Sequence, residues 1–193
     1  MPEGFFKLHS IIKNFYDRVI NVENDKEIIA EQNDTSEMKG KYLTFWTDKQ
    51  LFGVPIADVV QIIGKQEITP VPDSPHYAKG VINLRGDIIP VIDVRLRFGK
   101  EEVEYDEHTC IIVTKIDESH IGFIVDSVDE VTTISDNNIS PPPKMSKDRT
   151  NAYLTGIGKV DNKVVMLLDT SKILNESEIE LVNSTMVENI EQN

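Results

Sequence analysis

The sequence has a single cysteine, no long hydrophobic run and no excess of positive charge. One cysteine, Cys110, cannot form a disulfide within the chain, which fits a reducing compartment. No window approaches the roughly 20 apolar residues of a membrane-spanning helix, and the start of the chain lacks the pattern of a secretory signal. The formal charge of −13 is repelled by phosphate backbones and anionic lipid. We therefore expect a cytoplasmic protein that binds no nucleic acid and inserts into no membrane.

Patterns of metal binding and catalysis are missing as well. None of the four histidines lies three or four positions from another, and there is no Cys-x-x-Cys, so we expect no metal. Cys110 lies within the apolar run 109–113, which favours a buried, inert thiol over a nucleophile. The glycines near positions 86 and 156–158 lack the phosphate-loop spacing, so nothing supports a nucleotide or other cofactor.

Two aspartates leave one catalytic alternative open. Asp93 and Asp169 each follow an apolar segment, and a small enzyme could use this pair with a histidine. The other interpretation is that each carboxylate caps a short helix where a strand ends. We favour the caps, and we expect no catalytic residues.

The acidic residues are unevenly distributed along the chain. Residues 1–40 carry 5 basic and 8 acidic side chains, residues 41–175 carry 15 and 20, and residues 176–193 carry 0 and 5. The central segment is therefore only mildly acidic. We divide the chain into an N-terminal extension (1–40), a central domain (41–175) and an acidic C-terminal helix or tail (176–193).

The N-terminal extension begins with a helical pattern. Apolar residues recur at steps of three and four over 5–20, which predicts an amphipathic helix. Its apolar face could pack on its own domain, bind a partner or lie on a membrane surface. Residues 21–40 are polar and have the composition of a linker.

The central domain has the pattern of many short strands. Turn signals such as Asp48-Lys49, Gly86-Asp87 and Asp161-Asn162 separate them, which favours an all-β barrel or sandwich. Residues 56–63 predict a short helix leading into a strand. The other expected strands are 42–47, 51–54, 80–85, 88–92, 109–116, 121–126, 128–134, 153–160 and 164–168.

The C-terminal segment becomes helical again. Asn175 is a candidate N-cap with Glu178 three residues later, a variant of the capping box. Apolar residues then mark one helical face, which we expect to pack on the central domain.

Residues 80–99 form the most informative stretch. The pattern is a strand, a tight turn at 85–87, a second strand and a short helix. Gly86 can adopt positive φ in the turn, so Arg85 is presented at the corner of a stiff hairpin, where a guanidinium suits recognition of a carboxylate. Pro90 inside the second strand indicates an edge or a bulge.

This stretch resembles the signature of the CheW family, the coupling proteins of bacterial chemotaxis arrays. Residues 41–63, 153–158, 167–169 and 172–174 resemble further family elements in the same order. The resemblance implies two intertwined five-stranded SH3-like β-barrels that share one core, with short helices. It implies a scaffold that couples chemoreceptor cytoplasmic tips to the regulatory domain of the chemotaxis histidine kinase, with contacts between copies in rings. It also implies recruitment to membrane-associated receptor arrays.

The resemblance carries the family's receptor-sensitive positions onto this chain. The implied receptor-binding residues are Val59, Gln61, Gly80, Arg85 and Gly122. For the valine and the glycines, packing or turn geometry is an equal alternative. Gly86 and Gly156 are expected to act through the fold, and no residue is assigned to the kinase. Many relatives carry glutamate where this chain has Gln61, so we expect either an altered receptor preference or a second coupling protein in an organism with several.

Charged residues near this hairpin suggest a second expectation. Arg85, Arg95, Arg97 and Lys100 lie just before the acidic run 101–107. We expect a basic patch beside an acidic loop, a polarity suited to a protein held by partners on two sides.

A phosphorylation-receiving domain does not fit, since only 18 residues follow Asn175.

Overall fold

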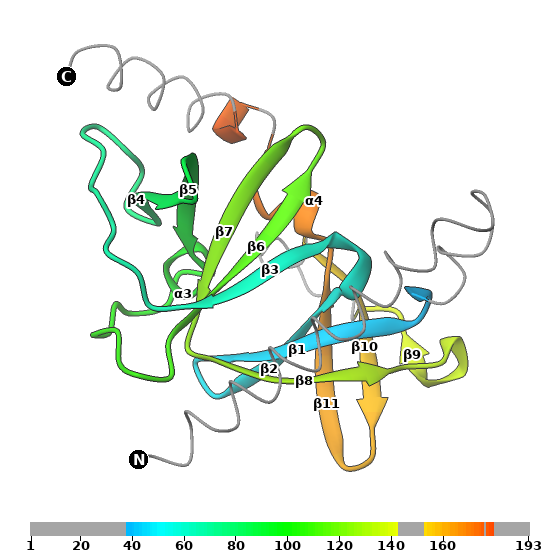
Figure 1. Cartoon of the computed structure of the whole chain (residues 1–193). Helices are drawn as coiled ribbons and strands as arrows, with labels where there is room; N and C mark the ends of the chain where they lie inside the picture. The colour runs from blue at the N-terminus through cyan, green and yellow to red at the C-terminus, as the bar shows by residue number, and fades with distance from the viewer. Residues whose placement is uncertain (1–37, 143–152, 176, 180–193) are drawn as a thin grey trace.

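A computed structural model describes residues 38–142, 153–175 and 177–179, and its core is built almost entirely from β-strands (Figure 1). The predicted helix 5–20 and most of the C-terminal segment lie outside the described residues. The elements are β1 (Lys41–Thr47), β2 (Gln50–Pro55), η2 (Ile56–Asp58), β3 (Val59–Gly64), β4 (Ala78–Leu84), β5 (Asp87–Asp93), α3 (Val94–Arg97), β6 (Cys110–Ile116), β7 (Ser119–Val125), β8 (Ser127–Thr133), η3 (Asp136–Asn138), β9 (Ile139–Ser140), β10 (Leu154–Val160), β11 (Lys163–Leu168) and α4 (Thr170–Ile173).

The strands form two sheets that exchange segments. One sheet has the order β8-β1-β2-β11-β10-β9, and the other has the order β3-β6-β7-β5-β4. The hairpin β1–β2 lies in the first sheet, but the next strand, β3, pairs with β6 in the second. In return, β7 lies in the second sheet and β8 pairs with β1 in the first. The expectation of two intertwined SH3-like barrels is confirmed.

The two barrels are built from a repeated unit. The sequence Tyr-x-x-Gly followed by Asp, with Tyr and Asp 16 positions apart, occurs at Tyr77–Asp93 and again 76 positions later at Tyr153–Asp169. In both units the aspartate N–H donates to the tyrosine carbonyl, at 2.8 and 2.9 Å. Each unit is a bulged hairpin followed by a one-turn helix.

A short extended segment pairs with each repeated hairpin and closes its barrel. In the first barrel, Thr69 exchanges two backbone hydrogen bonds of 2.9 Å with Val81. In the second, β9 pairs with β10 through Ser140 and Ile157, the position equivalent to Val81. The strand β9 was not expected from the sequence because it has only two residues before a proline run.

One core joins the barrels. The largest cluster of buried side chains takes residues from both sheets, including Phe45 and Leu168 from one and Ile92 and Phe123 from the other. Each such side chain contributes about 1.5–3 kcal/mol when it is fully removed from water. Because the two sheets share this core, their relative placement is fixed by packing.

Most elements lie within two residues of their predicted bounds. The short helix at 56–58 is a 3-10 turn, and the capping box is present: the Asn175 carboxamide accepts from Glu178 N–H, and Glu178 accepts from Asn175 N–H, both at 2.9 Å. The prediction of an edge position for Pro90 is wrong, because β5 has neighbouring strands on both sides. Pairing with β7 starts only at Val91, so the missing N–H of Pro90 removes no hydrogen bond to β7. Among the described residues, no helix is long and apolar enough to cross a membrane.

Candidate partner-binding site

The five residues expected to bind a receptor all belong to the five-stranded sheet. Val59 and Gln61 lie on β3, at one edge of the sheet, and Gly80 lies on β4, at the other. Arg85 occupies the turn between β4 and β5, and Gly122 lies on the central strand β7. The five residues therefore belong to the same sheet, but they do not form one exposed surface.

The glycines of this set are packed against the fold. Gly80 has φ +134°, and a Cβ there would overlap the Thr69 carbonyl, with its carbon only 2.8 Å away. The equivalent Gly156 would place a Cβ 2.7 Å from Ile139 Cγ2 on β9. Both glycines thus let the closing strand approach its hairpin. A Cβ on Gly122 would lie 2.8 Å from Ile111 Cγ2, so packing also requires glycine there.

The edge strand β3 exposes a different valine from the expected one. Val59 is buried, whereas Val60 is 43% exposed and Gln61 is half-buried. The register shifts between Val59 and Gln61, so Val60 is the extra residue of a β-bulge. Sequence reasoning missed Val60, because alternation within a regular strand gives no sign of a bulge.

Arg85 is held outward by a strained turn. Arg85 (φ 56°) and Gly86 (φ 102°) both have positive φ, as a two-residue type I′ turn requires. The Gly86 N–H donates to Asn83 Oδ1 at 2.9 Å, which fixes the turn. Arg85 is exposed and forms no ion pair with any residue that the structure describes. The expected presentation of this guanidinium is therefore confirmed, and the expected positive φ at Gly86 is present.

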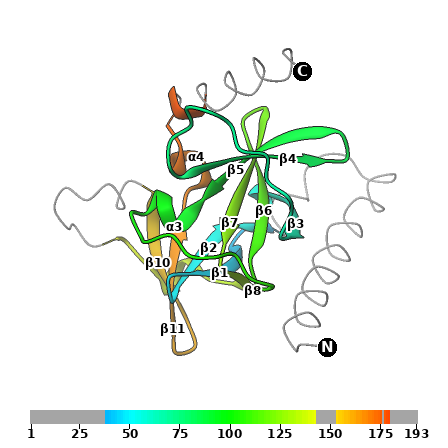
Figure 2. The same ribbon diagram turned by 90° about the vertical axis from the view of Figure 1, so that its left-hand side faces the viewer.

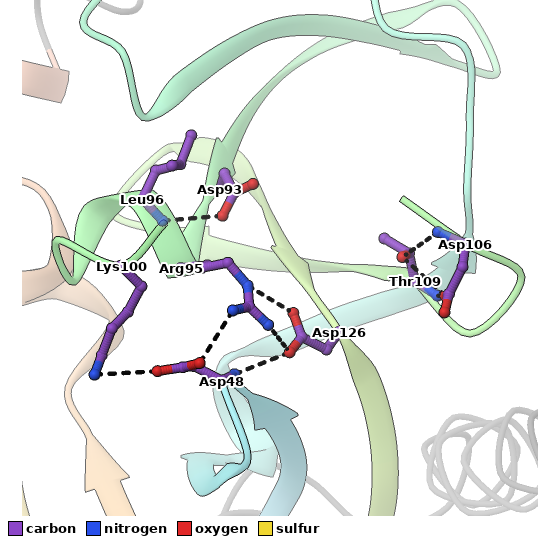
Figure 3. Close-up of polar contacts among 8 residues, drawn as sticks. All are labelled: Asp48, Asp93, Arg95, Leu96, Lys100, Asp106, Thr109 and Asp126. Carbon is purple, nitrogen blue, oxygen red and sulfur yellow. Dashed lines mark hydrogen bonds and ion pairs between the residues drawn. The ribbon is translucent and has the colours of Figure 1, made fainter. Parts of the chain in front are cut away.

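The prediction of a basic patch is wrong, because Arg95, Arg97 and Lys100 all form ion pairs within the molecule. Arg95, 13% exposed, binds Asp126 through two nitrogens and Asp48 at 3.2 Å, as Figure 3 shows. Lys100 Nζ lies 3.1 Å from the second oxygen of Asp48. The hydrogen bond and charge of Lys100, with the charge of Arg95, lower the pKa of the Asp48 carboxyl.

This group of four residues, Arg95, Lys100, Asp48 and Asp126, links three segments, and we call it the Arg95 bracket. Asp48 is in the β1–β2 turn of one sheet, Arg95 is in α3 after β5 of the other, and Asp126 is where the chain crosses from β7 to β8. The Asp48 N–H also donates to Asp126 Oδ2 at 2.9 Å. The bracket therefore joins the two barrels at their crossover.

The last arginine of the predicted patch anchors the C-terminal segment. Arg97 donates to Glu178 Oε2 at 2.9 Å and to the Ile173 carbonyl at 2.7 Å. Its guanidinium lies 4.6 Å from the ring centre of Tyr77 and 5.3 Å from that of Tyr153. Burial and the hydrogen bond to Glu178 raise the pKa of Tyr77 to about 12. We call Arg97, Tyr77, Tyr153 and Glu178 the C-terminal anchor.

A cleft of about 260 Å³ beside the Arg95 bracket is the place where a catalytic pair would be sought. Its lining includes Asp93, Arg95, Tyr105 and Asp126. Asp93 has a structural task there: it accepts from Leu96 N–H at 3.1 Å, capping α3, and from the Tyr105 hydroxyl at 2.7 Å. Burial, followed by that hydrogen bond, raises the pKa of the Tyr105 hydroxyl.

Asp169 is a helix cap in the other barrel and is absent from that cleft's lining. It accepts from Ser171 N–H at 3.1 Å and pairs with Lys172 at 2.8 Å. The preference for two caps is confirmed. Within 38–142, 153–175 and 177–179, no group of three or more His, Cys, Asp or Glu is arranged to hold a metal ion. Cys110 is buried as expected, and burial raises the pKa of its thiol to about 11.

Comparison with known proteins agrees with this architecture. The crystal structure of the scaffolding protein TtCheW from Thermoanaerobacter tengcongensis matches with a TM-score of 0.66 and 35% identity, covering 72% of this chain and 94% of that one. The two chains thus share the double-barrel fold.

Sequence comparison assigns the family. The model of the CheW-like domain matches residues 41–178. The chemotaxis protein CheW of Klebsiella aerogenes is 34% identical over 144 residues, covering 75% of this chain and 87% of that protein. That of Thermotoga maritima is 35% identical over 136 residues, covering 69% and 87%. The chain belongs to the CheW family.

Proposed function

We propose that this chain is a non-enzymatic adaptor of bacterial chemotaxis that couples the cytoplasmic tips of chemoreceptors to the regulatory domain of the chemotaxis histidine kinase. Membership of the CheW family supports this function, as does the similarity to the scaffolding protein TtCheW. The protein would act in the cytoplasm, where receptor arrays recruit it, and copies of it would also meet in rings.

The observation that best supports a receptor contact is the exposed, unpaired guanidinium of Arg85 among the described residues. Arg85 is the one member of the predicted basic patch whose guanidinium is exposed and unpaired among the described residues. A rigid type I′ turn presents it. Binding therefore costs the conformational entropy of the Arg85 side chain but little backbone entropy. An acidic group on the receptor tip is the expected partner.

The neighbouring contact surface would include the bulge on β3. Val60 supplies an exposed aliphatic group, and Gln61 supplies an amide where many relatives carry a carboxylate. We propose that Gly80 and Gly122 affect receptor binding only through the shape of the sheet, since neither has room for a side chain.

Replacing Arg85 tests this function. Arg85→Ala is expected to weaken binding of a receptor-tip fragment by about tenfold, the effect of losing one charge-assisted contact of about 1.4 kcal/mol. Lys115→Ala is a matched control, because Lys115 is another exposed cation (side chain 54% exposed) on a hairpin of the same sheet. Titration by surface plasmon resonance measures both. Equal binding by wild type and Arg85→Ala would show that the site is misplaced.

The amide at Gln61 allows a second test. Gln61→Glu restores the carboxylate carried by many relatives, and we expect it to change the ratio of affinities for two receptor tips that differ in charge at the contact. Competition binding measures that ratio. An unchanged ratio would remove Gln61 from the specificity-determining surface.

A further inference from the structure

Another pocket, of about 330 Å³, lies where the six-stranded sheet meets the segment that follows α3. Part of its lining comes from the strands β2, β10 and β11, and part from Phe98, the residue that ends α3. Figure 2 shows α3 beside these strands. We call this the α3 pocket. Its volume falls within the range of small-molecule sites, about 300–1,000 Å³, and none of the residues expected to contact a receptor lines it.

Apolar side chains on both sides of the α3 pocket are incompletely covered. They are Phe52, Phe98, Leu154 and Met166, of which Phe52 is buried and the other three are half-buried. The ring centres of Phe52 and Phe98 are 5.2 Å apart. Leu174, which takes the place of Phe98 in the second repeat, is only 1% exposed. The first repeat therefore leaves an apolar wall open that a ring or a branched aliphatic group can cover.

The hydroxyl of Thr47 lacks a partner at the same pocket. Thr47 is 1% exposed and belongs to the pocket lining. In the part of the chain that the structure describes, its Oγ1 is the one buried side-chain nitrogen or oxygen without a hydrogen bond. Buried polar groups in folded proteins are almost always paired. An unpaired hydroxyl in the wall of a pocket therefore points to a partner that is not part of the protein.

The remaining polar residues of the lining have more unused donors than acceptors. The Asp48 carboxylate is occupied by Arg95 and Lys100, as Figure 3 shows. The half-exposed Lys100 ammonium uses one of its three N–H donors for Asp48. The Gln50 amide nitrogen makes a long contact of 3.4 Å to a neighbouring backbone carbonyl. A carboxylate, which only accepts hydrogen bonds, is the group that complements these donors and the Thr47 hydroxyl.

We propose that the α3 pocket binds a small carboxylic acid with an aromatic or branched aliphatic body. The body packs between Phe52, Phe98 and Met166, and the carboxylate accepts hydrogen bonds from Lys100 and Thr47. A molecule bound there contacts the six-stranded sheet and the segment after α3 at the same time. The site uses neither Arg85 nor the bulge on β3, so it is independent of the proposed receptor contact.

A set of three related molecules tests the chemistry with the full chain. The first is 3-phenylpropionate, which we expect to bind with a dissociation constant of about 1 mM or below. The second, 3-phenylpropan-1-ol, lacks the charge, and the third, 3-phenylpropylamine, reverses it, so both should bind about tenfold more weakly or worse. Titrations followed by amide chemical shifts in NMR spectra measure the affinities and locate the site. Equal affinities for the acid and the amine would overturn the proposal.

Two variants at the polar end separate binding from folding. Thr47→Val keeps the side-chain shape and should weaken binding of 3-phenylpropionate about tenfold. Because the hydroxyl has no bond to lose in the free protein, the same variant should keep or raise the thermal unfolding midpoint. Lys100→Met should weaken binding about threefold or more, whereas Lys115→Met, at a cation of similar exposure, should leave it unchanged.

Leu154→Phe fills the pocket from its apolar side. Leu154 is half-buried, so the larger ring has the α3 pocket to occupy, and binding of the acid and the alcohol should both be lost. Unchanged affinity in this variant would show that the molecules bind elsewhere. A lower unfolding midpoint for Thr47→Val, or no binding of 3-phenylpropionate by wild type, would also overturn the proposal. None of these outcomes affects the receptor contact, which is measured separately on Arg85→Ala.

Discussion

At the scale of single residues, one glycine in each barrel determines how closely a neighbouring segment can approach the repeated hairpin. Gly80 and Gly156 occupy equivalent positions beneath the strands that close the barrels. At Gly80 the backbone also has positive φ, which disfavours any other residue. We therefore propose that Gly80 affects receptor binding only through the closure of the barrel.

Alanine at Gly80 should cost about 3 kcal/mol or more of the free energy of unfolding, because steric overlap adds to backbone strain. Gly86→Ala is the comparison: its φ is also positive, but no atom lies within 4 Å of a Cβ there, so the cost should be about 1 kcal/mol. Urea denaturation measures both variants. Similar losses for the two would contradict the packing role of Gly80.

At the scale of elements, the Arg95 bracket holds a turn, a helix and a crossover together. Arg95→Met leaves Asp48 and Asp126 facing each other without the guanidinium that joins them. We expect it to lower the free energy of unfolding by about 1–3 kcal/mol. Arg95→Lys should recover only part of this loss, since an ammonium cannot make the two-nitrogen contact with Asp126. Full recovery by lysine would show that charge alone matters.

The C-terminal anchor gives stability a dependence on pH. Burial acts to raise the pKa of Glu178, but hydrogen bonds from Asn175 N–H and the Tyr77 hydroxyl, with the charge of Arg97, outweigh it and lower the pKa. A lowered folded-state pKa means that the stabilisation is present above the ordinary pKa of glutamate and is lost as pH falls through the folded value.

Glu178→Gln should therefore be less stable than wild type at neutral pH, and the difference should shrink as pH falls from about 5 to 3. Thermal unfolding of both proteins across this range measures it. Since glutamine keeps the shape, the comparison isolates the charge. A difference that is independent of pH would contradict the ionised state of this carboxylate in the anchor.

The sequence predicts the individual strands and helices better than it predicts the pairings that close the two barrels. Alternation and turn residues located nearly every strand, and the aspartate caps and the capping box followed from local hydrogen-bonding rules. The strand β9 and the bridge at Thr69 could not be predicted in this way, because each gains its pairing from a distant hairpin. The prediction of a basic patch is wrong for the same reason. The carboxylates that pair with its arginines, Asp48, Asp126 and Glu178, are far from them in sequence. The 76-residue repeat is the one sequence signal for these pairings, because it indicates that an extended segment pairs with each of the two repeated hairpins.

At the scale of the whole molecule, exchanged strands and a shared core make the two barrels one body. A partner bound to one barrel therefore has a fixed geometry relative to a partner on the other. An adaptor needs this property, because it must hold receptor and kinase in a defined arrangement. In the proposed function, individually modest contacts would gain from avidity within an array.

The N-terminal extension can be tested at this scale. If the predicted helix 5–20 is a partner-binding element, deletion of residues 1–38 should weaken binding to receptor tips or to the kinase regulatory domain. The thermal unfolding of the shortened chain provides the control for folding. Unchanged binding to both partners would eliminate the partner-binding alternative for this segment.

The most direct test of adaptor function is a three-component assembly. The full chain, a receptor-tip fragment and the regulatory domain of the kinase are mixed and analysed by sedimentation velocity, with wild type and Arg85→Ala compared at equal concentration. The account predicts a complex containing all three components with wild type. With Arg85→Ala it predicts the same complex of chain and kinase domain, in which the receptor tip is incorporated with an affinity about tenfold lower. A ternary complex formed equally well by Arg85→Ala, or no complex with wild type, would contradict it.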